Sequence, residues 1–348
     1  MSRYDTLKTE LQASPCVWLV TGAAGFIGSH LVEQLLRLGQ TVRGLDNFAT
    51  GRRQNLDEVR ELVGPSAWER FTFMEGDICD PVICQQACAG VDYVLHQAAL
   101  GSVPRSMADP MRTHRTNVDG FMTMLVAARD AKVRRFVYAS SSSVYGDHPA
   151  LPKVEENTGA PLSPYAATKA INETYARVFT RCYSLPTVGL RYFNVFGPRQ
   201  EPNGPYAAVI PLWIKALLSG TEIVINGDGS TSRDFCYIAN VVQANLLAAT
   251  SKNTLDATTM NVAVGQQTTL LQLIKSISEI LTSTVVSAIP KVRYSPERIG
   301  DVRHSLADIS RAQTRLGYAV GVSFEDGLRR TVEALASGFA MNGRGNPG

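Results

Sequence analysis

The fold of this chain is decided by the stretch Val17-Trp18-Leu19-Val20-Thr21-Gly22-Ala23-Ala24-Gly25-Phe26-Ile27-Gly28, an apolar run that ends in three spaced glycines. An amphipathic segment follows at once, so the pattern predicts a strand, a phosphate-binding turn and a helix. Gly22 permits the tight turn, Gly25 lets the backbone approach a pyrophosphate, and Gly28 lets helix and strand pack closely. The N–H groups and the dipole at the helix start attract the anion. We therefore expect a dinucleotide-binding unit here.

An acidic residue follows at the distance that such a unit requires. Asp46 closes the next apolar segment, Thr41–Leu45, eighteen residues after Gly28. A carboxylate at this place hydrogen-bonds the adenosine ribose and repels a 2′-phosphate, which favours NAD over NADP as the cofactor. Arg52 and Arg53 lie close by in the sequence and leave NADP open at this stage.

The composition narrows the class of protein. The chain has 348 residues, which is enough for one large domain or two modest ones. A net charge of +3, with 19% charged residues, gives no indication of a nucleic-acid partner. No apolar run reaches membrane-spanning length, and the first fifteen residues lack the apolar core of an export signal. The six cysteines follow no zinc spacing, so we expect reduced thiols, no metal site and a cytoplasmic location.

Strands and helices are predicted to alternate through the first half of the chain. The strands are expected at residues 17–21, 41–45, 71–75, 91–96, 135–140 and 187–191. This alternation is typical of a Rossmann-type α/β fold, a doubly wound parallel sheet with right-handed crossovers. Ligands bind beyond the carboxyl ends of the strands in such sheets. The polar residues at these ends are Asp46, Asp77, Gln97, Ser140 and Tyr192.

The pattern weakens after Asn194, where prolines and glycines mark a loop-rich crossing. We expect residues 1–193 and about 232–265 to form the NAD-binding domain. We expect about 194–231 and 266–340 to form a smaller C-terminal α/β lobe that holds the substrate, and 341–348 to form a frayed tail. The later helices are expected at 210–219, 241–249, 268–281 and 324–335, with a short strand at 222–225.

Tyr165 and Lys169 lie four residues apart on one predicted helix and therefore share a face. A lysine ammonium and an oxidised nicotinamide ring both favour the phenolate, so they lower the pKa of a tyrosine from about 10. Tyr165 is then able to take a proton from a sugar hydroxyl as hydride leaves the same carbon. Serines 141 to 143 supply hydroxyls to the same oxygen. This spacing also occurs on ordinary helices, but the dinucleotide turn and the serine-rich strand end favour catalysis.

The segments that carry this chemistry are Gly22–Gly28, Asp46-Asn47, Ser140–Ser143, the Tyr165/Lys169 pair and Arg191-Tyr192-Phe193-Asn194-Val195-Phe196-Gly197. Together they resemble the extended short-chain dehydrogenase/reductases, over about residues 15–335. Within this family the chain is most similar to nucleotide-sugar 4-epimerases. The run His96–Ser106 resembles the UDP-N-acetylglucosamine C4-epimerases of bacterial polysaccharide biosynthesis.

The resemblance implies an NAD-dependent isomerase that acts on a UDP-sugar. The implied catalytic residues are Tyr165 as base and acid, Lys169, Ser141, Ser142 and Ser143. The implied cofactor-binding residues are Gly22, Gly25, Phe26, Ile27, Gly28, Asp46, Asn47, Asp77, Ile78, Gln97, Ala98, Tyr165, Lys169 and Tyr192. The implied substrate-binding residues are Gly101, Ser102, Asn194, Val209, Arg233, Arg298, Asp301 and Ser305.

Two places in the sequence bear on substrate and reaction. Related epimerases restricted to unacetylated UDP-hexoses carry a bulky aromatic where this chain has Ser305, so we expect room for an N-acetyl group on the sugar C2. Related 4,6-dehydratases place an Asp-Glu pair where this chain has Ser142 and Ser143, and elimination of water needs that extra acid and base. We therefore expect C4 epimerisation of UDP-N-acetylhexosamines, or of their uronic acids, through a 4-keto sugar.

Other functions stay open at this stage. They are UDP-glucose 4-epimerisation, a dehydratase, decarboxylase or reductase reaction on the same fold, and a non-catalytic NAD-binding regulator. The resemblance also implies a homodimer, in which the predicted helices Thr113–Ala131 and Pro164–Tyr183 pair with their symmetry mates in a four-helix bundle.

Overall fold

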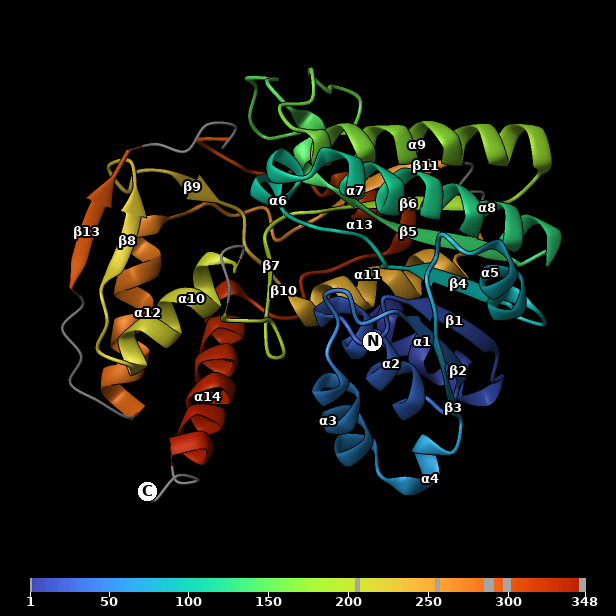
Figure 1. Cartoon of the computed structure of the whole chain (residues 1–348), viewed down its shortest axis with the longest axis horizontal. Helices are drawn as coiled ribbons and strands as arrows, with labels where there is room; N and C mark the ends of the chain where they lie inside the picture. Colours follow the sequence, from blue (N-terminus) through green and yellow to red (C-terminus); the bar gives the residue numbers. More distant parts are fainter. Residues whose placement is uncertain (1, 204–206, 254–256, 285–290, 297–301, 344–348) are drawn as a thin grey trace.

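A computed structural model describes residues 2–203, 207–253, 257–284, 291–296 and 302–343. Its centre is a seven-stranded parallel sheet with the strand order β11-β6-β5-β4-β1-β2-β3 (Figure 1). The strands are β1 (Val17–Thr21), β2 (Thr41–Asp46), β3 (Phe71–Glu75), β4 (Tyr93–His96), β5 (Arg135–Ser141), β6 (Thr187–Tyr192) and β11 (Thr258–Val262). The order reverses between β1 and β4, so the predicted Rossmann-type doubly wound sheet is confirmed.

Helices cover both faces of this sheet (Figure 1). One layer contains α1 (Arg3–Ala13), α2 (Phe26–Arg37), α3 (Arg53–Val63) and α11 (Ile238–Thr250). The opposite layer contains α5 (Pro81–Cys88), α8 (Gly120–Asp130) and α9 (Pro164–Tyr183). Because both faces are covered, the central strands are buried on both sides, and every residue of β6 is buried, including Thr187 and Arg191.

A smaller lobe lies beside the sheet (Figure 1). It contains the mutually packed helices α10 (Val209–Leu218), α12 (Leu270–Thr284) and α14 (Phe324–Gly343), and the parallel pair β8 (Ile223–Asn226) and β13 (Val292–Ser295). The segments between sheet and lobe pair as short strands. These are β7 (Val195–Phe196) with β10 (Cys236–Tyr237), and β9 (Ser232–Arg233) with β12 (Thr268–Thr269).

The long helix predicted over 113–131 is broken. Helix α7 (Pro110–His114) runs into a π-helical turn, Arg115–Asp119, before α8 begins. The turn places Asn117 against the loop after β4, where its Oδ1 accepts the N–H of Leu100 at 2.7 Å and its Nδ2 donates to the Leu100 carbonyl at 3.1 Å. A π turn inside a helix often marks a functional region.

Several elements were not predicted, among them the edge strand β11, α6 (Val103–Ala108) and α13 (Ser310–Leu316). The short helix α4 (Pro65–Trp68) follows α3. Within the described residues, no helix combines the length and the apolar character needed to cross a membrane. The same part of the chain holds no group of three or more His, Cys, Asp or Glu side chains placed to share a metal ion.

Candidate active site

The turn between β1 and α2 is shaped by two close approaches of the backbone. Gly22 has a φ of +69°, and a Cβ there would lie 2.9 Å from the backbone nitrogen of Ala98. A Cβ on Gly28 would lie 2.0 Å from the Gly22 carbonyl oxygen. Both positions therefore exclude a side chain, as the predicted phosphate-binding turn requires.

The N-terminus of α2 is open to an anionic ligand. Gly25 occupies the N-cap position and no side chain caps the first N–H groups. A cavity of about 360 Å³ adjoins this helix end. Among the predicted residues, its walls contain Gly22, Gly25, Phe26, Ile27, Gly28, Asp46, Asn47, Asp77, Ile78, Gln97, Ala98 and Gly101. Uncapped amides, the helix dipole and missing side chains together fit a pyrophosphate.

Asp46 lies at the carboxyl end of β2 and borders the same cavity. Its carboxylate accepts the N–H groups of Ala24 at 3.0 Å and Phe48 at 2.8 Å, and burial raises its pKa. The two arginines that left NADP open are engaged elsewhere. Arg52 donates to Glu201 and Arg53 to Glu75, each at 2.6 Å, and neither borders this cavity. The geometry thus favours NAD.

Tyr192 does not border this cavity but supports its wall. The Tyr192 hydroxyl donates to Gln97 Oε1 at 3.0 Å and accepts a hydrogen bond from Asn245 Nδ2 at 2.8 Å. Gln97 Nε2 closes the triangle by donating to Asn245 Oδ1 at 3.1 Å. Asn245 was not predicted, because nothing in the sequence distinguishes it from the other buried amides of α11, Asn240 and Gln243.

Two further cavity residues were missed because they come from the broken helix. Arg112 on α7 and Thr116 in the π turn both line the 360 Å³ cavity. Asp109 caps α7 by accepting the N–H of Arg112, and Pro110 follows it. An Asp-Pro pair at a helix start is a usable sequence signal for this new helix.

The end of β5 meets the predicted catalytic face of α9. Lys169 Nζ donates to the Ala139 carbonyl at 2.8 Å and lies 5.9 Å from the centre of the Tyr165 ring. Ser141 is within hydrogen-bonding reach of the Tyr165 hydroxyl. The structure therefore brings the predicted tyrosine, lysine and serine together at one strand end.

Burial dominates the ionisation of this group. It raises the pKa of Tyr165, although the hydrogen bond to Ser141 lowers it. It lowers the pKa of Lys169 to about 8, although the nearby Glu173 carboxylate raises it. Burial outweighs the hydrogen bond to Ser141, so the pKa of Tyr165 is raised in this structure. The predicted lowering also invoked the positive charge of an oxidised nicotinamide, and it stays a prediction.

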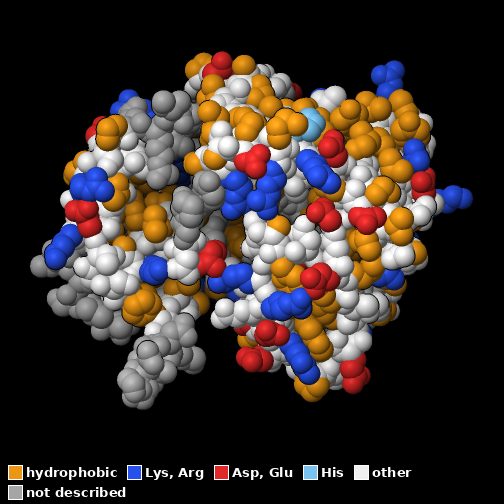
Figure 2. Space-filling model, in the orientation of Figure 1, with side chains coloured by type: hydrophobic (Ala, Val, Ile, Leu, Met, Phe, Trp, Pro, Cys, Tyr) orange, Lys and Arg blue, Asp and Glu red, His pale blue; other side chains and the backbone are white. Residues whose placement is uncertain are grey.

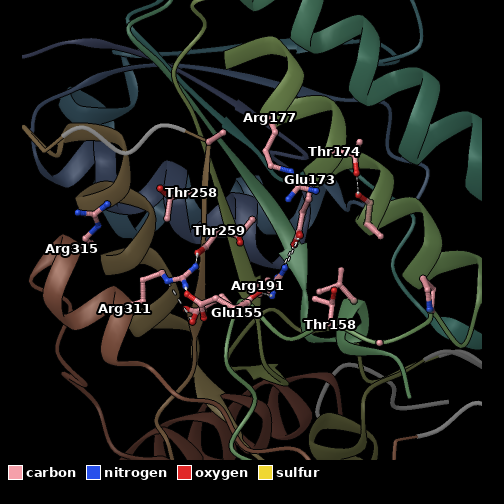
Figure 3. Close-up of a pocket in the computed structure, with 16 residues that line it drawn as sticks. Glu155, Thr158, Glu173, Thr174, Arg177, Arg191, Thr258, Thr259, Arg311 and Arg315 are labelled. Carbon is pink, nitrogen blue, oxygen red and sulfur yellow. Dashed lines mark hydrogen bonds and ion pairs between the residues drawn. The ribbon is translucent and has the colours of Figure 1, made fainter. Parts of the chain in front are cut away.

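Behind α9 lies a larger cavity of about 680 Å³ (Figure 3). Glu173 and Arg191 point toward each other at its wall and form a buried ion pair, with both guanidinium–carboxylate hydrogen bonds at 2.8 Å. Arg191 was quoted only for the family resemblance, and Glu173 was not predicted. Its spacing of four residues after Lys169 is the signal that would have found it.

Four of the predicted substrate-binding residues border two smaller cavities of about 140 Å³ and 170 Å³, and two of the four, Asn194 and Arg233, border both. Gly101 borders the 360 Å³ cavity instead. Ser142, Ser143 and Ser305 border the first, and Val209 borders the second.

The side chain of Ser305 is buried, and within the described residues its hydroxyl has no hydrogen-bond partner. Ser102 lies apart from these cavities, where it caps α6 by accepting the N–H of Arg105. Arg298 and Asp301 fall outside the described residues. Buried Lys153, which also borders the smaller cavity, was not predicted.

Comparison with known proteins agrees with this geometry. The profile of the NAD dependent epimerase/dehydratase family matches residues 18–263. The chain is 40% identical to the UDP-N-acetylglucosamine 4-epimerase of Methanobrevibacter ruminantium, solved with UDP-N-acetylmuramic acid, with a TM-score of 0.84 and coverage of 93% of this chain and 99% of that one.

Two relatives are described as UDP-glucose 4-epimerases. The chain is 37% identical to the Mycolicibacterium smegmatis protein over 317 residues, which are 90% of this chain and 97% of the relative. It is 33% identical to the Thermus thermophilus enzyme solved with NAD, with a TM-score of 0.80 and coverage of 92% and 98%. The chain belongs to the NAD-dependent epimerase/dehydratase family of nucleotide-sugar enzymes, and its cofactor is NAD.

Proposed function

We propose that this protein is a UDP-N-acetylglucosamine 4-epimerase, which interconverts UDP-N-acetylglucosamine and UDP-N-acetylgalactosamine. The observation that carries the substrate is Ser305. Its small side chain borders the cavity that also contains Ser142, Ser143 and Arg233. A serine there leaves space for the acetamido group on the sugar C2, and its buried hydroxyl is available to that group. The relative from M. ruminantium, which is described as a UDP-N-acetylglucosamine 4-epimerase, supports the same substrate class.

The reaction requires removal and return of a proton at one oxygen. NAD⁺ held in the cavity at the N-terminus of α2 would supply the acceptor for the hydride of the sugar C4 and, in its reduced form, the donor for its return to the opposite face. Tyr165 accepts the proton of the 4-hydroxyl as the carbonyl forms, and it gives the same proton back afterwards. Lys169 favours the phenolate form of Tyr165, and Ser141 holds the sugar oxygen by a hydrogen bond. Substrate and product are isomers, so no cofactor is consumed.

The serine pair supports epimerisation over elimination of water. Ser142 and Ser143 border the small cavity and offer hydroxyls only. A hydroxyl has no acid or base strength near neutral pH comparable to that of a carboxyl group, which elimination needs. We infer that the 4-keto sugar turns over and is reduced again without losing water.

NMR spectroscopy of the purified protein with UDP-N-acetylglucosamine, and with no added cofactor, tests this proposal. We expect the galacto epimer to accumulate to equilibrium, and Tyr165→Phe to abolish its formation. A dehydrated or unchanged sugar nucleotide would refute the assignment. UDP-glucose, supplied in a parallel sample, separates the two epimerase classes.

Ser305→Tyr tests the substrate class directly. The ring would fill the space beside C2, so we expect turnover of UDP-N-acetylglucosamine to fall by at least about tenfold while turnover of any accepted UDP-glucose is kept. Ser305→Ala is the matched control, because it removes the hydroxyl without adding bulk. Equal turnover of the acetylated sugar by wild type and Ser305→Tyr would contradict the role of this position.

We also propose that the enzyme is a homodimer in which α8 and α9 pair with the same helices of a second copy. The two helices pack side by side in one layer. Tyr175 and Val178 on α9 and Met111 on α7 are exposed large apolar side chains. Figure 2 shows hydrophobic side chains on the upper edge of the molecule, where Figure 1 places α8 and α9.

A further inference from the structure

Glu173 continues the row that Tyr165 and Lys169 begin on α9, since the three residues follow at intervals of four. The Glu173 side chain is only 7% exposed. Arg191 donates to both carboxylate oxygens at 2.8 Å (Figure 3). Ser140 Oγ donates to Glu173 Oε1 at 2.6 Å. These three hydrogen bonds hold the carboxylate in one position behind the lysine.

The other titratable groups around Lys169 and Glu173 carry no negative charge. His96 on β4 faces Lys169, and burial lowers the pKa of its imidazole to about 3. Tyr138 on β5 faces Glu173, and burial raises the pKa of its phenol far above the ordinary value. Both are therefore neutral near pH 7. Tyr165 is neutral in its phenol form, whose pKa burial raises, and becomes an anion only in the phenolate form that accepts the substrate proton. Among the described groups that act on Lys169, Glu173 is the anion.

The cations nearby act on other groups. Arg191 on β6 lies 4.8 Å from the centre of the Tyr145 ring and also donates to the Glu155 carbonyl at 3.0 Å. Arg177, further along α9, acts on Tyr138. Of the Arg191–Glu173 pair, the carboxylate is the member that acts on Lys169, where it opposes the effect of burial.

We propose that Glu173 is a positioning residue for Lys169, whose fixed carboxylate keeps the lysine charged beside Tyr165 at the pH at which the enzyme works. This inference rests on the proposed epimerisation, in which the ammonium favours the phenolate. Without the carboxylate, burial acts on Lys169 unopposed, so the lysine loses its proton at a lower pH. The alkaline side of the pH profile of kcat/KM reports this loss.

Two variants separate charge from structure. Glu173→Gln/Arg191→Gln removes both charges together and so avoids leaving a buried arginine unpaired. Ser140→Ala keeps both charges and removes one hydrogen bond. We expect the alkaline limb to move about one pH unit lower in the double variant and to stay in place in Ser140→Ala. A slower double variant with an unmoved limb, or an equal shift in both variants, would overturn the proposal. Should the double variant not fold, Glu173→Asp withdraws the carboxylate and is expected to shift the limb in the same direction by less.

Equilibrium unfolding requires no catalytic turnover, so it tests this inference separately from the proposed function. Lys169 in the native protein has a pKa of about 8, while an unfolded lysine titrates near 10.4. The unfolded state therefore binds more protons between these values, and stability rises with pH across them. Urea unfolding from pH 6 to 10 should show this rise beginning about one pH unit lower in the double variant than in wild type. The same onset in both proteins would refute the role of Glu173, whereas a wild type that epimerises no UDP-sugar would refute the proposed function alone.

Discussion

Asp234 shows how one buried residue organises the candidate substrate site. Its side chain is fully buried, and it accepts the N–H groups of Val264 and Gly265 at 3.0 Å and of Ala307 at 3.2 Å. Burial raises its pKa from 3.8 to about 6, against the effect of these hydrogen bonds. The carboxylate thus links its own segment, which contains the neighbouring Arg233, to the segment of Val264 and Gly265 and to the segment of Ala307. Ala307 lies two residues after Ser305.

The sign of this pKa shift makes a prediction for stability. Between pH 4 and 6 the native state binds more protons at Asp234 than the unfolded state, so stability falls as pH rises through this window. A shift of about two units corresponds to about 3 kcal/mol. The asparagine side chain of Asp234→Asn does not titrate. We therefore expect the difference in free energy of unfolding between wild type and this variant to shrink by up to this amount from pH 4 to pH 7. Urea unfolding at pH 4 and at pH 7 measures this difference in free energy. An equal difference at both pH values would show that the Asp234 carboxylate is ionised over the whole range.

At this scale, local patterns predicted the cofactor side of the site better than the substrate side. The glycines and Asp46 follow from backbone sterics and from spacing along one βαβ unit, and they border one cavity. Lys153 and Arg112 reach the cavity walls through packing between segments distant in sequence. Periodicity in the sequence records no such contact, so neither residue was predicted.

At the scale of elements, the π turn in the helix after β4 connects cofactor and catalytic helix. Asn117 holds both backbone groups of Leu100 and donates to Thr168 Oγ1 at 3.2 Å, one residue before Lys169. We expect Asn117→Ala to lower the free energy of unfolding by about 2–4 kcal/mol, because it leaves the buried groups of Leu100 unpaired. Chemical denaturation measures this loss, and the NAD content of the purified variant is expected to fall with it.

Thr168→Val is the control for that variant. It removes the two hydrogen bonds of the Thr168 hydroxyl, from Asn117 Nδ2 and to the Tyr165 carbonyl, and it keeps both hydrogen bonds between Asn117 and Leu100. An equal loss of stability in both variants would place the effect on α9 instead of on the loop after β4.

The π turn was not predicted because a π insertion leaves the apolar pattern of the helix almost unchanged. Strand β11 was not predicted because it lies at the edge of the sheet, where the partly buried Thr258 and Thr259 break the apolar run.

At the scale of the whole molecule, the site depends on how the lobe meets the carboxyl edge of the sheet. Asn194, Arg233 and Ser305 come from segments far apart in the sequence and border one small cavity. Only the resemblance to a family predicted these three residues as substrate-binding. Their spacing along the chain does not indicate how the lobe packs against the sheet. The alternating pattern of the first 192 residues, by contrast, was sufficient for the six strands it predicted.

The predicted dimer is a property of this same scale. Tyr175 and Val178 are 38% and 43% exposed, which is unusual for large apolar side chains on adjacent turns of one helix. A charge in the middle of an isologous contact is buried twice, so we expect Val178→Glu to shift wild-type dimer to monomer at micromolar concentration. Leu62→Glu on α3 is the control, because Leu62 is 47% exposed in the opposite helix layer. Light scattering after size-exclusion chromatography reports the masses. A monomeric wild type, or a dimer that Val178→Glu leaves intact, would show that α9 does not form the contact.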